Sequence, residues 1–492
     1  MSHKKIPFVL AVASMALLAS CGTPSADPTP SNSSESKDDT SATAPIESTP
    51  IESNTNVTDE EFDPAKPVTI NFWHTMGKTP GQEVLDSMIA RFNEIYPNIT
   101  VEHSQQGGYD EIHSTINENL ATGNLPTMAY CYEDHVASYI DHNAVLDMTP
   151  YVEDPVYGLG HNPAGYDLGD LGVEDMTPSY WAPGAAYAVE GRYSFPFSKS
   201  TEALFYNKSI FDANGWEAPK TWDEMWDICE QIRSMPEYAN NDDFYCLGYD
   251  SDANLVIGGF EQRGLPYTSL ELNASGSHFN FNTAENKAFV SELKSHYDNH
   301  YLVTKGSSSN NAYTSNLFTA GTCLMSIGST GGTSYNYTDN FDVGVAGVPQ
   351  EDVNDPKMLS QGPSICFFKR GTTKAQRTAA WLFYKFITNT DNSAYFAYRS
   401  GYNPVRDSSY SSVFLTDEIE TATGSAGLIR DVFHYIGDAN NGYLTGQFTS
   451  PAFKGSSVAR IEMDGLLASV LLGTKTVDKA FNDAMANCVF AE

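Results

Sequence analysis

Polar and aromatic residues follow three predicted strands in the first part of the globular region. They are Trp73-His74, Gln106-Gly107-Gly108-Tyr109 and Glu133-Asp134. Ligands of an open α/β sheet bind beyond the carboxyl ends of its strands. The sequence therefore predicts a ligand-binding edge here. Packing and hydrogen bonding explain His74 more simply than catalysis does.

A glycine-rich segment later in the chain has the composition of an anion-binding loop. It reads Gly328-Ser329-Thr330-Gly331-Gly332. Hydroxyl groups and successive backbone N–H groups in such a loop can donate to an anion.

Catalytic and metal-binding motifs are absent from the sequence. It contains no HExxH, GxSxG, P-loop or EF-hand pattern, and no cysteine spacing typical of zinc. Counting alone does not exclude a carboxylate pair, but nothing nominates one. We therefore expect no catalytic residue, no metal and no cofactor. A lipid-anchored extracellular hydrolase is the rival class, and a surface adhesin is a third.

The strand-end residues need an alternating α/β framework to position them. Alternation predicts a strand over residues 68–72, and apolar spacing predicts helices over 85–95 and 112–120. Further strands are predicted from residue 99 and over 128–132. This order predicts an α/β domain with parallel pairing.

The same alternation continues to the C-terminus, without a repeat of fixed period. Further strands and helices are predicted over residues 203–206, 222–232, 284–297, 323–327, 375–388, 466–471 and 477–484. The absence of a fixed period argues against a solenoid or propeller.

Composition and charge narrow the function classes. The 492 residues are 41% hydrophobic and 12% aromatic, which is enough to build a substantial core. The net charge of −34 argues against nucleic acid as a partner, because phosphate contacts need clustered Lys and Arg. It argues equally against electrostatic attachment to an anionic membrane.

The N-terminus reads as an export signal that ends in a lipidation site. Lys4 and Lys5 precede an apolar stretch over residues 6–18, followed by Leu18-Ala19-Ser20-Cys21. This resembles a bacterial lipoprotein signal over residues 1–20, with Cys21 as the lipidated residue. An ordinary export signal or a short membrane anchor are the alternatives. We expect the extracytoplasmic face of the cell membrane, and the sequence does not decide between cell surface and periplasm.

Residues 21–64 read as a tether. They are rich in Ser, Thr, Pro, Asp and Glu and lack apolar periodicity, so we expect them to be disordered. The sequence leaves the pairing of the six later cysteines open between disulfides and buried thiols.

Ordered sequence blocks from about Val68 onward carry a family resemblance. They are Asn71-Phe72-Trp73-His74-Thr75-Met76, Arg91-Phe92-Asn93, Gly108-Tyr109, Tyr132-Glu133, Phe195-Pro196-Phe197-Ser198-Lys199-Ser200-Thr201, Phe205-Tyr206-Asn207-Lys208, Pro219-Lys220-Thr221-Trp222, Gly401-Tyr402-Asn403-Pro404-Val405 and Leu472-Gly473-Thr474-Lys475-Thr476. In these blocks the chain resembles the family 1 extracellular solute-binding proteins of ABC importers, and most of all their glycerol-3-phosphate-binding members.

The resemblance implies an α/β periplasmic-binding-protein-like fold of type II. Two discontinuous lobes would be joined by hinge crossovers, with the ligand in the cleft between them. Lobe 1 would comprise residues 65–198 and 326–400, and lobe 2 residues 199–325 and 401–492. The chain would cross near 195–201, return near 323–329 and cross again near 400–405.

The resemblance also implies a set of ligand contacts. Tyr109 and Glu133 would hold glycerol hydroxyls, and Ser200 would add a hydroxyl contact from the crossover. The phosphate would be bound by Ser329, the backbone at Gly362, Tyr402 and Arg460. Arginine suits this role because its permanently charged guanidinium binds phosphate in a bidentate manner.

One departure from the family pattern leaves the ligand open. The family places a Trp shortly after its Cys-Gly-Tyr run, but residues 246–254 contain no Trp. The missing wall could admit a glycerophosphodiester, a sugar or another polyol phosphate. Taken singly, each of these seven residues has a plainer role, Arg460 as a surface charge and Gly362 as a turn residue. Their coincidence in one pattern favours ligand binding.

Together these observations predict a lipid-anchored, monomeric, non-enzymatic binding protein. It would deliver glycerol-3-phosphate or a glycerophosphodiester to ABC permease subunits. The alternative is a sugar or oligosaccharide on the same scaffold.

Overall fold

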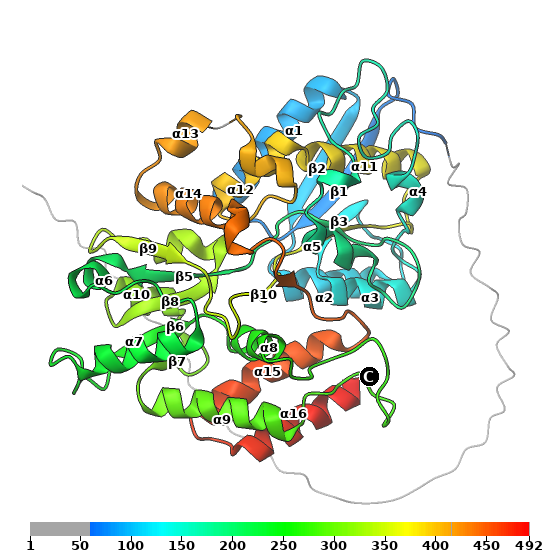
Figure 1. Cartoon of the computed structure of the whole chain (residues 1–492). Coiled ribbons are helices and arrows are strands. Elements are labelled where there is room, and N and C mark those ends of the chain that lie inside the picture. The colour runs from blue at the N-terminus through cyan, green and yellow to red at the C-terminus, as the bar shows by residue number, and fades with distance from the viewer. Residues whose placement is uncertain (1–59, 415, 492) are drawn as a thin grey trace, which may run out of the picture. The chain divides into compact units, whose positions relative to one another are not determined.

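The computed structural model describes residues 60–414 and 416–491. The predicted signal, Cys21 and almost all of the predicted tether lie outside the described residues. The chain from residue 60 forms alternating helices and strands around two five-stranded sheets (Figure 1).

The first sheet has the strand order β2-β1-β3-β11-β4. Its strands are β1 (Val68–His74), β2 (Ile99–Gln105), β3 (Met128–Cys131), β4 (Phe195–Pro196) and β11 (Ser364–Phe367). β1 pairs in parallel with β2 and β3, as predicted, whereas β11 pairs antiparallel with both β3 and β4.

The second sheet has the order β7-β6-β8-β5-β9. Its strands are β5 (Glu202–Asn207), β6 (Tyr245–Tyr249), β7 (Leu302–Thr304), β8 (Cys323–Ser329) and β9 (Val343–Ala346). β6 is parallel to β7 and β8, and β5 is antiparallel to β8 and β9. A separate parallel ribbon joins β10 (Met358–Leu359) to β12 (Gln447–Phe448).

Helices cover both sheets. They are α1 (Glu83–Ile95), α2 (Tyr109–Asn119), α3 (Glu133–Asp141), α4 (Thr149–Val152), α5 (Pro178–Trp181), α6 (Lys208–Asn214), α7 (Trp222–Ser234), α8 (Asp252–Gln262), α9 (Ala284–Asp298), α10 (Thr314–Thr319), α11 (Lys374–Ile387), α12 (Thr390–Ser400), α13 (Thr416–Glu420), α14 (Gly424–Gly437), α15 (Ser456–Leu471) and α16 (Val477–Ala491). Each strand and helix predicted from periodicity is present in the structure.

Local sequence signals explain where several helices begin and end. Thr221 and Glu224 form a reciprocal capping box at the start of α7, and Thr373 and Gln376 do the same for α11. α12 ends at Gly401, whose φ of 81° is a left-handed conformation that favours glycine.

The chain changes sheets at one place that we predicted and at one that we did not. Residues 197–201 connect β4 to β5, within the predicted crossover. The predicted return near 323–329 is different: all of β8 belongs to the second sheet, and so does β9. The crossing was implied by the family resemblance, whereas β8, the strand predicted there from its buried run, is the central strand of the second sheet. The chain returns through residues 347–363 to reach β11, so residues 326–329 and 343–346 lie in the second sheet, on the other side of the predicted boundary.

Each sheet has its own apolar core. The core of the first sheet includes Phe72, Phe92 and Trp381, so α11 packs on this sheet although it is far away in sequence (Figure 1). The core of the second sheet includes Leu247, Leu324 and residues of α15 and α16. Separate cores allow the two sheets to act as separate bodies.

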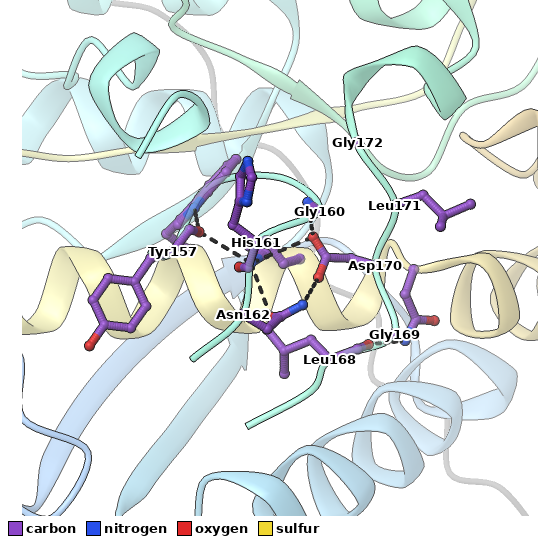
Figure 2. A network of polar contacts seen from close by, with 12 residues as sticks. Tyr157, Gly160, His161, Asn162, Leu168, Gly169, Asp170, Leu171 and Gly172 are labelled. Atoms are coloured by element: carbon purple, nitrogen blue, oxygen red, sulfur yellow. Dashed lines mark hydrogen bonds and ion pairs between the residues drawn. The ribbon is translucent and has the colours of Figure 1, made fainter. Parts of the chain in front are cut away.

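A buried lysine fastens the long connection after α4 to the first sheet's helices. Lys385 of α11 donates to the carbonyl oxygens of Tyr157 and His161, at 3.2 and 2.7 Å (Figure 2). Its ammonium nitrogen lies 3.5 Å from a carboxylate oxygen of Asp170, and both side chains are fully buried. Asp170 accepts in turn from the Gly160 N–H and from Asn162, each at 2.8 Å. The connection is therefore tied down by a satisfied polar network.

The cysteines settle an alternative that the sequence left open. Cys131, Cys229, Cys246, Cys323 and Cys366 are buried thiols and form no disulfide. Burial raises the pKa of Cys131 and Cys229 well above the ordinary value, so these thiols are unreactive.

Candidate functional site

Two cavities meet at one arginine. The smaller has a volume of about 390 Å³ and is lined by Tyr109, Glu133 and Gly362, among others. The larger, of about 1020 Å³, is lined from the second sheet's side by residues such as Ser329. Both cavities are lined by Gln361, Arg460 and Asp464.

Element ends position the side chains of the smaller cavity. Tyr109 is the first residue of α2, and Glu133 is the first residue of α3, directly after β3. This is the strand-end placement that the sequence analysis anticipated. Arg460 comes from the first turns of α15, which packs against α8 and α16.

Six of the seven predicted residues lie at or beside the two cavities, and one does not line either of them. Tyr109, Glu133, Gly362 and Arg460 line the smaller cavity, and Ser329 and Arg460 line the larger one. The hydroxyl of Tyr402 lies 3.3 Å from that of Tyr109, which brings it to the same place. Ser200 lines neither of these cavities. It is 2% exposed, and its backbone exchanges hydrogen bonds with Gln361. Their roles as ligand contacts stay predictions.

Glu133 has a partner that the sequence analysis missed. Its carboxylate accepts from the Lys199 ammonium at 3.1 Å and from the Ser364 hydroxyl at 2.7 Å. Lys199 is 2% exposed and also donates to the Gly362 carbonyl at 3.1 Å. Lys199 therefore neutralises the carboxylate that we predicted to bind polyol hydroxyls. Nothing in the local sequence links the two residues, because they are 66 positions apart.

Residues of the second sheet and of α8 orient the Arg460 side chain. Its guanidinium donates to the side-chain oxygen of Asn254. The Asn254 amide donates to Glu202 at 2.7 Å, and the Tyr249 hydroxyl donates to the other Glu202 oxygen at 2.6 Å. Burial raises the pKa of Glu202. Arg460 itself is exposed, so its remaining N–H groups are accessible in the cleft.

Most carboxylates of the larger cavity are engaged by the protein. Asp252 accepts from the Thr304 hydroxyl at 2.5 Å and from the Gly306 N–H at 2.8 Å. Asp250 accepts from the backbone and side chain of Thr314, at 2.6 and 2.7 Å. Burial raises the pKa of Asp252 to about 6. These hydrogen bonds hold the carboxylates in place, whereas burial, which raises their pKa, favours the neutral form.

Two predicted features have structural roles. The Ser329 hydroxyl accepts from the Gly331 N–H at 3.2 Å, so this backbone donor of the predicted anion loop is already in use. Gly362 has φ of 81°, and a Cβ there would lie 1.9 Å from the Ser198 carbonyl oxygen. Only glycine allows this approach to the crossover.

His74 is a structural residue, in line with the simpler interpretation. It is fully buried, and its Nδ1 accepts from the Met76 N–H at 3.1 Å. Its Nε2 therefore carries the proton and donates to His103 at 2.9 Å, and His103 donates to Asp86 at 2.9 Å.

The described residues offer neither a metal-binding cluster nor a membrane-spanning helix. No group of three or more His, Cys, Asp or Glu side chains is placed to hold a metal ion within 60–414 and 416–491. Among the same residues, no helix has the length and apolarity needed to cross a bilayer.

Two mixed sheets with cavities large enough for a small solute are typical of a solute-binding protein. Comparison with known proteins supports this assignment. A model of the bacterial extracellular solute-binding protein family matches residues 87–423. The chain belongs to this family, and it is a binding protein rather than an enzyme.

Two sequence relatives are also named as solute-binding proteins. The sn-glycerol-3-phosphate-binding periplasmic protein UgpB of Salmonella typhimurium is 26% identical over 358 residues, which cover 70% of this chain and 75% of that protein. UgpB of Escherichia coli K12 is 26% identical over 354 residues, with the same coverage.

Solved structures share the two-lobed α/β fold. UgpB of Mycobacterium tuberculosis in complex with glycerophosphocholine superposes with a TM-score of 0.65 at 18% identity, covering 86% of this chain and 98% of that one. The cyclic α-maltosyl-1,6-maltose-binding protein of Arthrobacter globiformis also scores 0.65, at 17% identity, covering 86% and 99%. The chain therefore has the two-lobed periplasmic-binding-protein fold.

Proposed function

We propose that this protein captures glycerol-3-phosphate or a glycerophosphodiester outside the cell membrane and delivers it to an ABC permease. The proposal rests on the position of Arg460. Its side chain lines both cavities where they meet, so its positive charge can interact with a phosphate bound there. The phosphate of a diester bound there would place one alcohol substituent in each cavity, and a monoester would place its glycerol in one of them.

The smaller cavity suits the glycerol end. Tyr109 offers a phenol to a hydroxyl, and Tyr402 lies within 3.3 Å of that phenol. Because Lys199 neutralises Glu133, this end accepts polyol hydroxyls without leaving an unpaired buried charge. The UgpB relatives, which are named for binding sn-glycerol-3-phosphate, support this choice.

The larger cavity favours a diester over a monoester. Its volume of about 1020 Å³ exceeds what a glycerol monoester needs, since pockets for whole drug-sized ligands begin at about 300 Å³. A second alcohol on the phosphate would occupy this space.

A sugar or oligosaccharide is the second candidate, and the same cavity favours it. Tyr313 and Tyr335 line it with 53% and 73% of their surfaces exposed, and Asn311 and Asn316 line it as well. Exposed aromatic rings beside amides and carboxylates suit a stacked sugar ring.

Capture would follow from lobe closure. A solute that contacts both sheets' residues only in the closed arrangement binds that arrangement more tightly and shifts the population toward it. We propose that the hinge runs through residues 197–201 and 347–363 beside 400–405. We also propose that the protein is monomeric and lipid-anchored through Cys21.

Calorimetric titration with glycerol-3-phosphate, glycerophosphocholine and maltose tests the proposal. We expect binding of at least one phosphate ester, with the ester recovered unchanged. Binding of maltose alone would favour the sugar alternative. Hydrolysis of a bound ester would contradict both.

A further inference from the structure

The short β10–β12 ribbon carries an unusual group of polar atoms beside the cleft. The side-chain oxygens of Ser360 and Thr449 and the amide nitrogen of Gln361 are buried, and none has a hydrogen-bond partner among residues 60–414 and 416–491. Ser360 is only 8% exposed. All three residues line the smaller cavity, and Gln361 lines both cavities.

Their backbones are firmly held, so the unpaired side chains are not a sign of a loose segment. The Ser360 N–H donates to the Phe448 carbonyl at 2.7 Å, which extends the β10–β12 pairing. Gln361 exchanges backbone hydrogen bonds with Ser200 of the crossover, at 2.7 and 3.0 Å. The backbone that carries these side chains is therefore held rigidly beside the cleft, while the side chains themselves make no hydrogen bonds to other described residues through these atoms.

Buried polar atoms without partners are costly. Each is expected to cost stability relative to a satisfied group, because the buried group has lost its hydrogen bonds to water, and native proteins contain few of them. Three such atoms in three residues that line one cavity call for an acceptor that is absent from the protein itself.

We propose that Ser360, Gln361 and Thr449 form a set of hydrogen-bond donors to the solute's oxygen atoms beside Arg460. In the free protein the three groups lie covered in the cavity wall. When the solute enters, rotation about their side-chain torsions turns them to its oxygens. The solute then receives three donors next to a fixed cation, and the protein loses three unsatisfied groups. The identity of these oxygens as phosphate rests on the proposed function; the donor set itself does not.

A residue that donates to the solute and a residue that packs the core differ in how their substitution changes the stability of the solute-free protein. Replacing an unpaired polar atom by an apolar group of similar shape removes a cost, so the free protein should become no less stable. Replacing a satisfied packing residue should destabilise it. The pair of readouts, stability without solute and affinity for solute, separates the two roles.

The test uses Ser360→Ala, Thr449→Val and Gln361→Met in the full mature chain. Thr268→Val is the matched control, because the Thr268 hydroxyl is also buried without a partner, and the residue lines neither cavity. Each variant is melted without solute and then titrated with glycerol-3-phosphate, glycerophosphocholine and maltose. We expect melting temperatures equal to or above wild type. The three cleft variants should bind about 3- to 10-fold more weakly, and the control should bind as wild type does.

Gln361→Glu separates phosphate from sugar ligands. A carboxylate at this position should weaken binding of glycerol-3-phosphate far more than the Met variant does, and it should affect maltose much less.

The outcomes distinguish this inference from the proposed function. If wild type binds a phosphate ester and the three variants bind it equally well, the donor set is wrong and the proposed function stands. If wild type binds only maltose and the variants weaken it, the donor set stands and the phosphate assignment is wrong. If the three variants are clearly less stable than wild type without solute, the proposal that these residues are hydrogen-bond donors to the solute is wrong. Failure of wild type to bind any of the probes overturns both.

Discussion

Among single residues, Arg460 gives the most direct test of the proposed phosphate site. Its exposure in the cleft means that water already competes for its N–H groups. We therefore expect Arg460→Ala to cost about 1.5–3 kcal/mol of binding to glycerol-3-phosphate, the range for hydrogen bonds to charged groups, or roughly 10- to 150-fold in affinity. Arg460→Lys keeps the charge but loses the planar fork, so its affinity should lie between the two.

Calorimetric titration measures this series, and Lys454→Ala is a suitable control because Lys454 is exposed and lines neither cavity. An Arg460→Ala protein that binds glycerol-3-phosphate as tightly as wild type would contradict the phosphate assignment. A neutral solute would then fit the same scaffold better.

Asp134 gives the smaller cavity a pH dependence. Burial raises its pKa to about 6, with further contributions from its neighbours. The carboxylate is therefore mostly neutral at pH 5 and mostly charged at pH 7.5. The charged form repels the solute's phosphate, so affinity for a diester without a cationic group, such as glycerophosphoglycerol, should fall as the pH rises through 6. A diester suits this measurement because its phosphate does not titrate in this range.

Asp134→Asn should flatten that pH profile when it is measured by titration at pH 5 and pH 7.5. His135 lines the same cavity, but burial lowers its pKa to about 4, so it stays neutral at both pH values. Asp252, with a pKa of about 6 in the larger cavity, leaves a residual slope that Asp252→Asn removes. A profile unchanged in the double variant would argue against an anionic solute at this site.

Sequence reasoning located single residues of the site better than their partners. Tyr109 and Glu133 were found because they follow strands, and the position of Arg460 came from the family pattern. The Lys199–Glu133 pair and the Asn254–Glu202 support of Arg460 were not found. Such contacts join residues 66 and 52 positions apart, and they depend on how two sheets meet, which no local pattern encodes.

At the scale of the element, the network around Lys385 makes a specific prediction. Removing the ammonium by Lys385→Met leaves the fully buried Asp170 without its cation. We expect a loss of about 3–5 kcal/mol in the free energy of unfolding, because a buried charge without a partner is strongly destabilising. Denaturant titration measures the effect.

The double variant Lys385→Met, Asp170→Asn serves as the control. It removes both charges, and the Asn side chain still accepts one hydrogen bond, so it should recover part of the lost stability. A double variant less stable than the sum of the two single changes would show that the ion pair is not the source of the effect.

Four long helices were predictable from the sequence, and the shortest strands were not. Apolar periodicity located α1, α7, α9 and α11, since each spans at least three turns. The two-residue strands β4, β10 and β12 are too short to alternate, and pairing with distant residues creates them. The position of the return crossover rested on the family resemblance, and it was wrong because β8 and β9 both pair within the second sheet. A buried run predicts a strand, but it does not predict which sheet the strand joins.

At the scale of the whole molecule, the acidity of the chain and the charge of the proposed solute have to be reconciled. The net charge of −34 repels an anion at long range. At physiological salt this repulsion is screened beyond about 8 Å. Arg460 and Lys305 both line the larger cavity, and Lys199 neutralises Glu133 beside the smaller one. We therefore expect local hydrogen-bond donors and cations to dominate the interaction with a phosphate ester, while the surrounding negative charge keeps the protein soluble.

The anchor proposed at Cys21 determines where this capture takes place. Cys21→Ala removes the thiol that would carry the lipid while keeping the export signal of residues 1–20. We expect the variant to leave the membrane fraction, because the residue that would carry the lipid is gone. Cell fractionation with immunodetection measures this, and mass spectrometry of the wild-type N-terminus should show a lipid-modified cysteine. Ser20→Thr, beside the same cysteine, is the control for the processing of the signal. If Cys21→Ala still fractionates with membranes and wild type carries no lipid, then the N-terminal segment holds the protein at the membrane as an uncleaved anchor.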